Sequence, residues 1–322
     1  MDGIKGKVRI DLSKSKVKSN SYFKKLAKDF AKNKYIYIMA FPVVLYYIIF
    51  HYIPMYGAVI AFKYYSIADG VFGSEWAGFD HFMRFFASPF FRRVTVNTIS
   101  INFAMLVCAF PSPIIFALLM NEIQIKRIKG VFQTISYLPH FISVIVICGM
   151  IHQFTGEQGI INDIIASFGG NRGSLLLNPD YFKPIYVISG IWTELGWESI
   201  IYLGALSGID ATLYEAAKID GANKWKQTLN VTIPGIMPTI VIMLILRIGQ
   251  MMDVGFEKIM LLYNASIMES ADVISTYVYR VGLLNFNYDY SSAVGLFNSV
   301  INFALLIMAN YVSKRVNGSG LW

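Results

Sequence analysis

Apolar runs long enough to cross a bilayer divide this sequence, and they constrain its fold more than any other feature. A membrane-spanning helix needs about 20 consecutive, mostly apolar residues, and six runs approach that length. They cover residues 36–53, 96–120, 134–154, 184–206, 236–252 and 293–312. Charged residues make up only 15% of the chain, whereas soluble domains carry about a quarter. We therefore predict an all-α, polytopic membrane protein with six transmembrane helices.

Two of these runs have features that modify this expectation. Pro111 and Pro113 lie inside the second run, where we expect a kink because proline has no N–H to donate. The fifth run could continue as far as Leu262. The two cysteines, Cys108 and Cys148, both fall in apolar runs. We interpret them as small core residues rather than as a disulfide or a metal-binding pair.

The distribution of basic residues sets the expected orientation. Residues 1–34 hold eleven Lys and Arg against three acidic residues, which is typical of the cytoplasmic flank of a first span. Such a tail can also bind nucleic acid, but the flank explains it better, and we expect no nucleic-acid partner. Part of it, residues 21–34, could lie on the inner leaflet as an amphipathic helix. With both termini cytoplasmic, the inner segments hold 19 Lys and Arg and the outer loops hold 7.

Motifs that carry enzyme chemistry are missing from the sequence. There is no phosphate-binding GxxxxGK[ST] pattern, no HExxH and no GxSxG, so the chain has no obvious ATP site or catalytic site of its own. The four histidines match no spacing of metal ligands. We therefore expect neither an enzyme nor a metalloprotein, and six spans without catalytic motifs favour a transport function.

A charged stretch, residues 207–235, interrupts the apolar pattern on the predicted cytoplasmic side. Asp210 is suited to cap a helix, and Gly221 stands where a glycine would end it. A second short helix could follow from Asn223 to about Asn230, and Pro234 and Pro238 would then redirect the chain into the fifth span. Helices this short are marginal alone. They must pack either on the protein's own membrane helices or on a cytoplasmic partner.

The same stretch resembles the EAA loop of the permease subunits of ABC importers. The residues that carry the resemblance are Glu215, Ala216, Ala217, Asp220, Gly221, Ala222 and Pro234, with Ile233 and Pro238 beside them. The resemblance implies that two short helices seat in a cleft of a separate ATP-hydrolysing subunit. It also implies that Glu215 meets a basic residue there and that Gly221 permits the sharp turn. Thr228 departs from the pattern, since many members have a large apolar residue at that position.

The resemblance extends from about residue 35 to the C-terminus, the permease domain 35–322, whereas the basic tail 1–34 has no comparable motif. Stretches such as 133–143, 190–210 and 272–283 are similar to permeases for complex carbohydrates and oligosaccharides, of the type I importer fold. This implies a multi-pass protein of the cell membrane that imports saccharides as one half of a permease heterodimer. It further implies two ATPase subunits, which bind the ATP and Mg, and an extracellular solute-binding protein. The chain itself would bind no cofactor and would contact membrane lipid.

Polar residues inside the spans are the candidates for a substrate path, because such residues are costly in a membrane and usually face a cavity or a partner. The candidates are Trp192, Glu194, Trp197 and Glu198 in the fourth run, and Asn298 and Asn302 in the sixth. Carboxylates, amides and aromatic faces all suit sugars. The asparagines could instead pair with the partner subunit, and the tryptophans could form an interfacial belt. Arg247 with Asp253 or Glu257 is better explained as a structural ion pair or a gate element.

Three other functions stay open from the sequence, one of which is a scaffold without transport activity, favoured only if no partner ATPase co-purifies. The EAA pattern alone is compatible with an ABC permease for another solute, such as an amino acid or phosphate. An ion-coupled secondary transporter could use the intramembrane carboxylates as a proton relay, but it would leave the 207–235 loop unexplained.

Overall fold

The computed structural model describes residues 28–317 and Gly320. They belong to two compact units, residues 1–59 and 60–322. Residues 1–27, which are most of the predicted basic tail and the first half of its predicted amphipathic helix (21–34), lie outside the described residues. Each unit is considered by itself.

From Lys34 on, the described part of the first unit is an apolar helical segment. It consists of α2 (Lys34–Tyr47), the π-helical turn η1 (Ile48–Tyr52) and α3 (Ile53–Met55), followed by the 3₁₀ turn η2 (Tyr56–Phe62). None of the residues in α2, η1 and α3 is buried within the structure. A helix that is apolar on all sides and uncovered is suited to lipid or to another membrane helix.

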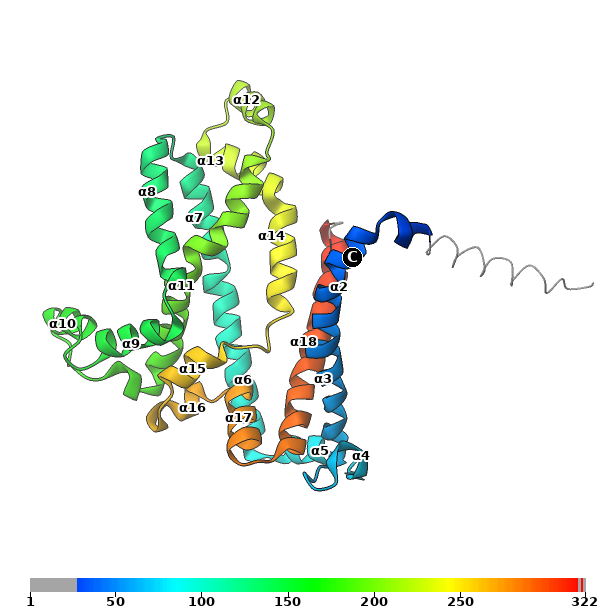
Figure 1. Cartoon of the computed structure of the whole chain (residues 1–322). Coiled ribbons are helices and arrows are strands. Elements are labelled where there is room, and N and C mark those ends of the chain that lie inside the picture. Colours follow the sequence, from blue (N-terminus) through cyan, green and yellow to red (C-terminus); the bar gives the residue numbers. More distant parts are fainter. Residues whose placement is uncertain (1–27, 318–319, 321–322) are drawn as a thin grey trace, which may run out of the picture. The chain divides into compact units, whose positions relative to one another are not determined.

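The second unit is built around one central helix. Its long helices are α6 (Pro89–Ala104), α7 (Pro111–Glu122), α8 (Lys126–Tyr137), α11 (Pro179–Ser207), α14 (Ile233–Ile248) and α18 (Tyr288–Asn317), and the π-helical turn η3 (Met105–Ala109) leads into α7. α11 contacts α7, α8 and α14, and Figure 1 shows these four helices side by side. α18 packs on α14. A displacement of α11 would therefore also displace most of the helices of this unit.

Within the described residues, five segments are long and apolar enough to cross a membrane. They are Lys34–Phe62, Pro89–Glu122, Val144–Ser167, Lys224–Ile248 and Tyr288–Arg315. The fourth predicted run lies on α11, which is 29 residues long but carries Lys183, Glu194 and Glu198 and is not among the five. The chain is thus a multi-pass, mostly helical membrane protein, and its polar central helix distinguishes it from a bundle of uniformly apolar spans.

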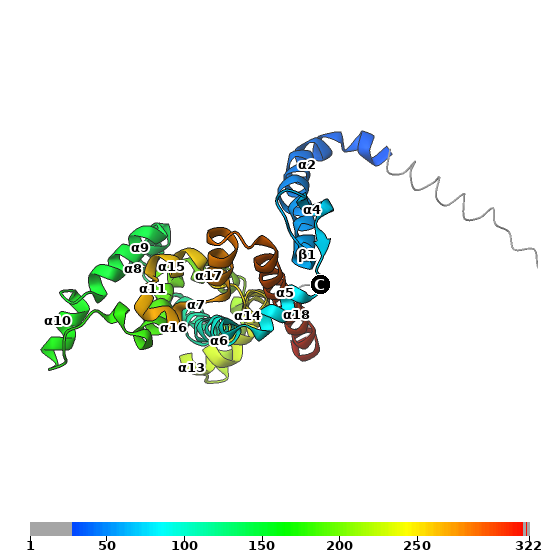
Figure 2. The same ribbon diagram turned by 90° about the horizontal axis from the view of Figure 1, so that it is seen from below.

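The helix predicted for the third run is interrupted at residues 138–143. α8 ends at Tyr137, a 3₁₀ turn η4 (Leu138–Phe141) follows, and α9 (Val144–Thr155) begins after Ser143. Pro139 sits in the first turn of η4, and the Ser143 hydroxyl accepts from the Val146 amide to cap α9. The next helix, α10 (Ile160–Ser167), lies at the edge of this unit beyond α9, as Figures 1 and 2 show.

Three of the prolines that lie in helices are accommodated in the same way. In three places the residue just before a proline donates its amide to the carbonyl five residues back: Ile53 to Ile48, Phe110 to Met105 and Ile233 to Thr228. These are the π-helical turns η1, η3 and η6 (Thr228–Thr232). The missing proline N–H is absorbed by a local widening of the helix. In the second run, where we predicted a kink, the helix has the π-helical turn η3 just before Pro111.

Short elements complete the unit. They are β1 (Lys63–Tyr64) paired antiparallel with β2 (Glu75–Trp76), the helices α4 (Gly70–Gly73), α5 (Asp80–Ala87), α15 (Phe256–Leu262), α16 (Met268–Ala271) and α17 (Ile274–Tyr279), and the turns η5 (Leu175–Leu177), η7 (Ala265–Ile267) and η8 (Arg280–Leu284). The helix of the fifth predicted run, α14, ends at Ile248. The possible continuation of this run to Leu262 is instead a separate helix, α15, which follows a turn.

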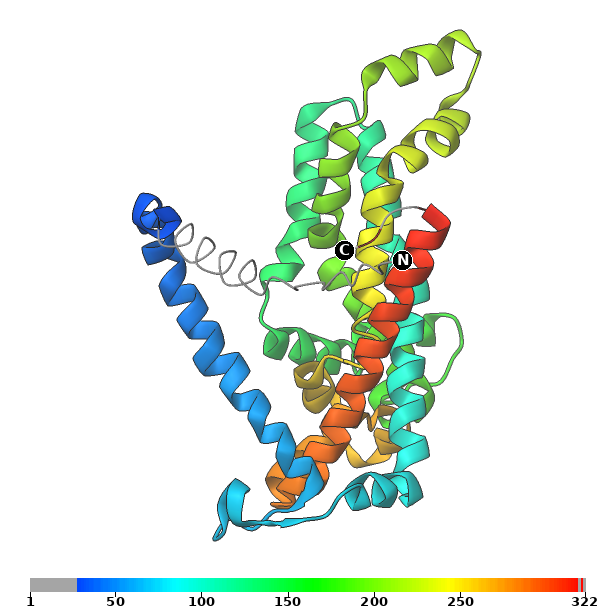
Figure 3. The ribbon, with the colours of Figure 1, turned by 90° about the vertical axis from the view of Figure 1, so that its right-hand side faces the viewer.

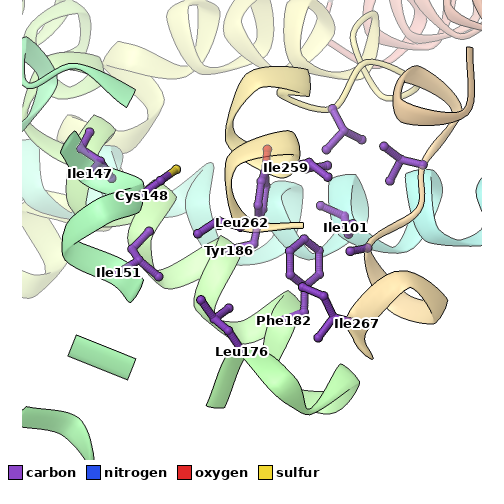
Figure 4. Packing of buried hydrophobic residues seen from close by; sticks show 13 residues of the cluster. Ile101, Ile147, Cys148, Ile151, Leu176, Phe182, Tyr186, Ile259, Leu262 and Ile267 are labelled. Atoms are coloured by element: carbon purple, nitrogen blue, oxygen red, sulfur yellow. The ribbon is translucent and has the colours of Figure 1, made fainter. Parts of the chain in front are cut away.

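The largest buried cluster joins helices that are far apart in sequence (Figure 4). It contains Ile101 of α6, Cys148 of α9, Phe182 and Tyr186 of α11, and Ile259 of α15, among others. Cys148 is thus the core residue we expected. The prediction that Cys108 is a core residue is wrong: it lies in the π-helical turn η3 and is exposed.

A buried ion cluster fixes the loop after α15 to α6. The Asp272 side chain is fully buried and accepts from Arg93 over 2.9 Å and from Arg280 over 2.8 Å. The Thr276 hydroxyl donates to the same carboxylate over 3.0 Å. The Asn97 amide donates to the Asp272 carbonyl over 3.0 Å. Two arginines from different elements therefore share one carboxylate, which holds the polypeptide of 263–284 against the bundle.

Candidate functional site

The charged stretch folds into the predicted helical elbow. Its first helix, α12 (Ala211–Ile219), begins where the Asp210 carboxylate accepts the Thr212 amide over 2.9 Å. That hydrogen bond lowers the pKa of the Asp210 carboxyl below its ordinary value. α12 ends at Gly221, whose φ of 73° lies in the left-handed region. The amides of Gly221 and Ala222 return to the carbonyls of Lys218 and Ala217, which is the Schellman arrangement that favours glycine.

The second arm differs from the prediction at its far end. α13 (Lys224–Gln227) begins after Asn223, close to the expected start of the second helix, and Asn223 caps it by accepting from the Lys226 amide over 2.9 Å. The helix then continues without a break through η6 into α14. The expectation that Pro234 and Pro238 redirect the chain between a short second helix and the fifth span is wrong. Pro234 lies in the first turn of α14, after the π turn that accommodates it, and Pro238 lies inside α14.

The elbow is attached to the bundle at its base. The Tyr214 hydroxyl of α12 is 3.1 Å from the Thr232 hydroxyl, and Lys224 forms an ion pair of 2.9 Å with Glu122 at the end of α7. Because α13 and α14 are one continuous helix, a force on the elbow is transmitted directly to α14.

The outer face of the elbow is uncovered. No residue of α12 is buried, Glu215 is exposed, and the exposed fractions of Ile219 and Trp225 are 86% and 70%. Large apolar side chains exposed among charges mark a surface that another protein covers. Figures 1 and 3 show α12 beyond the ends of α7, α11 and α14, at the end of the unit opposite to α5.

A second polar site lies at η4, the turn that follows the end of α8. His140, in η4, donates from Nδ1 to the Glu194 carboxylate of α11 over 2.8 Å. The His140 ring stacks on Trp197 with centroids 4.4 Å apart and an interplanar angle of 3°. Glu194 and Trp197, both predicted for the substrate path, are thus joined by a histidine that the prediction did not include.

The His140 and Glu194 side chains line a cavity of about 550 Å³. Other parts of its wall come from α11, α15 and η3, and include Tyr186, Gly190, Thr193, Phe256, Glu257 and Lys258. The volume is in the range of small-molecule sites. Carboxylate, imidazole, hydroxyl and aromatic groups converge there, which is the combination of hydrogen-bonding groups and flat apolar faces that a saccharide needs.

A second cavity, of about 520 Å³, shares Phe256 with the first. Asn298 and Ser275 line it, together with Tyr279 and Tyr288. Among the described contacts, Asn298 Oδ1 and Ser275 Oγ are buried without a hydrogen-bond partner. Buried polar atoms are rarely left unsatisfied, so a ligand with hydroxyl groups would complete them.

The other predicted path residues lie elsewhere. Trp192 lines a smaller, almost wholly apolar pocket of about 240 Å³ between α9 and α11. Glu198 is half-buried and lines neither polar cavity. The side-chain carbonyl of Asn302 (Oδ1) accepts from the Met252 amide over 2.7 Å. This gives a backbone N–H of the turn after α14 its hydrogen-bond partner. Within the described part of the chain, Arg247 has no ion pair with Asp253 or Glu257.

The sequence reasoning missed His140 and Lys258, although each gave a signal. His140 follows Pro139 in the middle of an apolar run, and Lys258 lies where that reasoning allowed the fifth run to continue. A lone polar residue in such a place is a site candidate. As for metals, no group of three or more His, Cys, Asp or Glu residues that could hold an ion occurs in the residues that the structure describes.

Known proteins resemble the chain over almost its whole length. It is 42% identical to the polygalacturonan/rhamnogalacturonan transport system permease protein YteP of Bacillus subtilis, over 93% of this chain and 94% of that protein. It is also 42% identical to protein LplB of the same organism, over 90% and 92%. In structure it is similar to a chain of a bacterial alginate ABC transporter, solved in complex with an alginate pentasaccharide-bound periplasmic protein. That match has a TM-score of 0.85 and 40% identity and covers 92% of this chain and all of that one.

The family comparison covers both sites. Residues 85–318, which include the elbow, η4 and both polar cavities, match the family described as binding-protein-dependent transport system inner membrane component. The relatives are transport permeases, and the geometry of the elbow and of the cavities fits that role. This chain therefore belongs to the family of inner membrane components of binding-protein-dependent ABC transport systems.

Proposed function

We propose that the chain is the transmembrane permease of an ATP-driven importer for oligosaccharides derived from complex polysaccharides. The observation that carries the proposal is the pairing of two sites in one unit. An uncovered elbow is continuous with α14, and a polar, aromatic cavity lies between η4, α11 and α15. The cargo class follows the relatives, whose names and titles specify polygalacturonan, rhamnogalacturonan and alginate.

The sugar path in this proposal is narrower than the sequence suggested. Glu194, held by His140, binds the sugar in the first cavity, where the carboxylate accepts hydroxyl hydrogens and the rings of Tyr186 and Phe256 pack on C–H surfaces. Trp197 supports this site by stacking on His140 and does not line the cavity. Asn298 continues the path in the second cavity. Phe256 lines both cavities. Depending on its conformation, its side chain separates the two cavities or leaves them connected. Trp192 and Asn302 have contacts that explain them without a sugar, and Glu198 lines neither polar cavity.

The elbow is the proposed contact with the ATPase. Glu215, Ala216, Ala217, Asp220, Gly221, Ala222 and Pro234 form or support the docking element. ATP and Mg bind to the partner ATPase, of which two copies act, and this chain holds no cofactor. Closure of the ATPase pair pushes the elbow, and α14 carries the movement to the cavities. A second permease subunit completes the pathway, and an extracellular binding protein delivers the sugar.

The proposed topology has six membrane-spanning segments, with α11 as the fourth in spite of its charged residues. Its Glu194 is paired with His140 and its Lys183 donates to Ser100 over 2.8 Å, so partners within the bundle offset the cost of these charges. Both termini and the elbow then lie on the cytoplasmic side of the cell membrane.

An uptake assay tests the function. The assembled importer, reconstituted in vesicles with its binding protein, should accumulate labelled oligosaccharide only when ATP is supplied, and a protonophore should not reduce the rate. Uptake that survives without ATP but is lost with the protonophore would identify an ion-coupled transporter. ATP-driven uptake of an amino acid or phosphate, and not of sugar, would leave the permease assignment intact and overturn the cargo.

The docking part is tested separately with Glu215→Ala. We expect this variant to lose most of the co-purifying ATPase while the permease still inserts. Glu157→Ala is the matched control, because Glu157 is also an exposed glutamate but lies in the turn between α9 and α10. If both variants retain the ATPase equally, the elbow is not the docking element.

A further inference from the structure

Lys258 is a cation without an acidic partner on the wall of the first cavity. Its ammonium donates to the Tyr186 carbonyl over 3.0 Å and lies 4.6 Å from the centre of the Tyr186 ring. Both contacts are with neutral groups. Among the residues that the structure describes, no carboxylate forms an ion pair with it, and the residue is only partly accessible.

The surroundings of Lys258 keep its ammonium at the cavity wall. Gly190 of α11 lines the same cavity, and a Cβ at that position would lie 3.7 Å from Lys258 Nζ and 3.0 Å from Met105 Cε. The absence of a side chain at Gly190 therefore leaves room for the ammonium beside α11. An ammonium has three donors, and the Tyr186 carbonyl uses one of them.

The other ionisable groups of this wall have different environments. Glu194 already has a partner, the imidazole of His140 at 2.8 Å, and Glu257 is exposed. A partly buried ammonium whose hydrogen bond goes to a neutral carbonyl and which forms no ion pair is costly to maintain. The cost is offset when a ligand brings a negative charge to it, and charge-assisted hydrogen bonds of this kind are the strong ones.

We propose that Lys258 selects acidic saccharides by binding a sugar carboxylate in the first cavity. This inference rests on the proposed function, and it makes the anionic group of a uronic acid residue, rather than its hydroxyls, the feature that the permease itself recognises. The Glu194 carboxylate and the Thr193 hydroxyl face the same cavity and take the hydroxyls of the same sugar.

The test measures binding to the permease without the binding protein, which would impose its own selection. The complex of this chain with its second permease and ATPase subunits is titrated by calorimetry with trigalacturonate and with its fully methyl-esterified form. The two probes have the same length and the same hydroxyls, and differ in that each charged carboxylate of the acid is a neutral methyl ester in the other. We expect the unmodified complex to bind the acid about tenfold or more tightly than the ester, which is typical for a hydrogen bond to a charged group.

Two substitutions then locate the preference. Lys258→Met should abolish it and leave binding of the ester within about twofold, so that the ester reports intact folding, and Lys258→Arg should retain most of it because the charge is kept. The inference is overturned if Lys258→Met keeps the preference, if it weakens both sugars equally, or if the unmodified complex does not prefer the acid. If neither sugar binds the unmodified complex, it is the saccharide function itself that fails.

Discussion

At the scale of single residues, a few side chains tie together segments that are far apart in the sequence. Asp272 joins α6 to the loop after α15, and His140 joins η4 to α11. Both are polar groups with partners on other elements, at distances of 2.8 to 2.9 Å. They differ in accessibility, since the Asp272 side chain is fully buried whereas His140 and Glu194 line a cavity. We therefore assign the first to stability and the second to the substrate path.

The Asp272 cluster gives a stability prediction. Asp272→Ala leaves Arg93 and Arg280 without their shared carboxylate, and we expect a loss of about 3–5 kcal/mol in the free energy of unfolding, as for other broken buried ion pairs. The control is Asp163→Ala, which removes a 2.7 Å ion pair with Arg172 whose side chains are about half exposed. Exposed pairs are worth at most about 1 kcal/mol. Thermal unfolding of the purified complex should show this contrast, and equal effects would contradict the structural role of Asp272.

At the scale of elements, close approach of helices depends on glycine at one position of α11. A Cβ on Gly196 would overlap the carbonyl oxygen of Ser136, so α8 and α11 pack backbone to backbone there. This contact sets the position of η4, and so of His140, because η4 follows directly after α8. Small residues at helix contacts are the general means by which membrane helices approach closely.

Two substitutions on the same helix test this contact. Gly196→Ala should destabilise the protein by about 1–3 kcal/mol, as overpacked sites do. Gly204→Ala should be neutral or stabilising by up to about 1 kcal/mol, because nothing lies within 4 Å of a Cβ there and alanine is the better helix former. Unfolding midpoints of the two variants measure the difference. If Gly204→Ala is as destabilising as Gly196→Ala, helix approach is not the cause.

The elbow gives a prediction about backbone conformation alone. Gly221 has a φ of 73°, and a Cβ added to it would meet no atom within 4 Å, so any penalty for a side chain comes from the left-handed conformation. Gly221→Val should reduce coupled uptake strongly, since a β-branched residue is strained there. Gly221→Asn should keep most of it, because asparagine tolerates this region. Equal uptake by the two variants would show that the turn is not needed for coupling.

The elbow and the cavity differ in how far the sequence predicts them. Asp210 and Gly221 have the capping roles that the sequence indicates, and the second helix begins next to Asn223 as predicted, because helix ends are determined by neighbours within a few residues. The continuation of α13 into α14 is not predicted, because the π turn at Thr228–Thr232 accommodates Pro234 in a way that a proline rule does not anticipate. The contact between His140 and Glu194 joins residues 54 positions apart, and no local pattern indicates it.

At the scale of the whole molecule, the function depends on the two ends of the unit of residues 60–322 facing different compartments. The elbow lies at one end of the bundle and α5 at the other (Figure 3). The basic residues favour the elbow side as cytoplasmic, since positive charge collects there. ATP is available only inside the cell and the binding protein only outside it, so the proposed mechanism requires this orientation.

Thiol labelling tests the orientation in a chain whose Cys108 and Cys148 are replaced by alanine. Lys218→Cys places a thiol on α12, and Ala68→Cys places one in the exposed loop before α4. A membrane-impermeant thiol reagent added to intact cells should label Ala68→Cys and spare Lys218→Cys, and inverted vesicles should reverse the pattern. Both thiols should react in detergent, which controls for accessibility. Labelling of Lys218→Cys from outside would place the elbow away from any ATPase, and the coupling mechanism would then be wrong even if the fold and the cavities are as described.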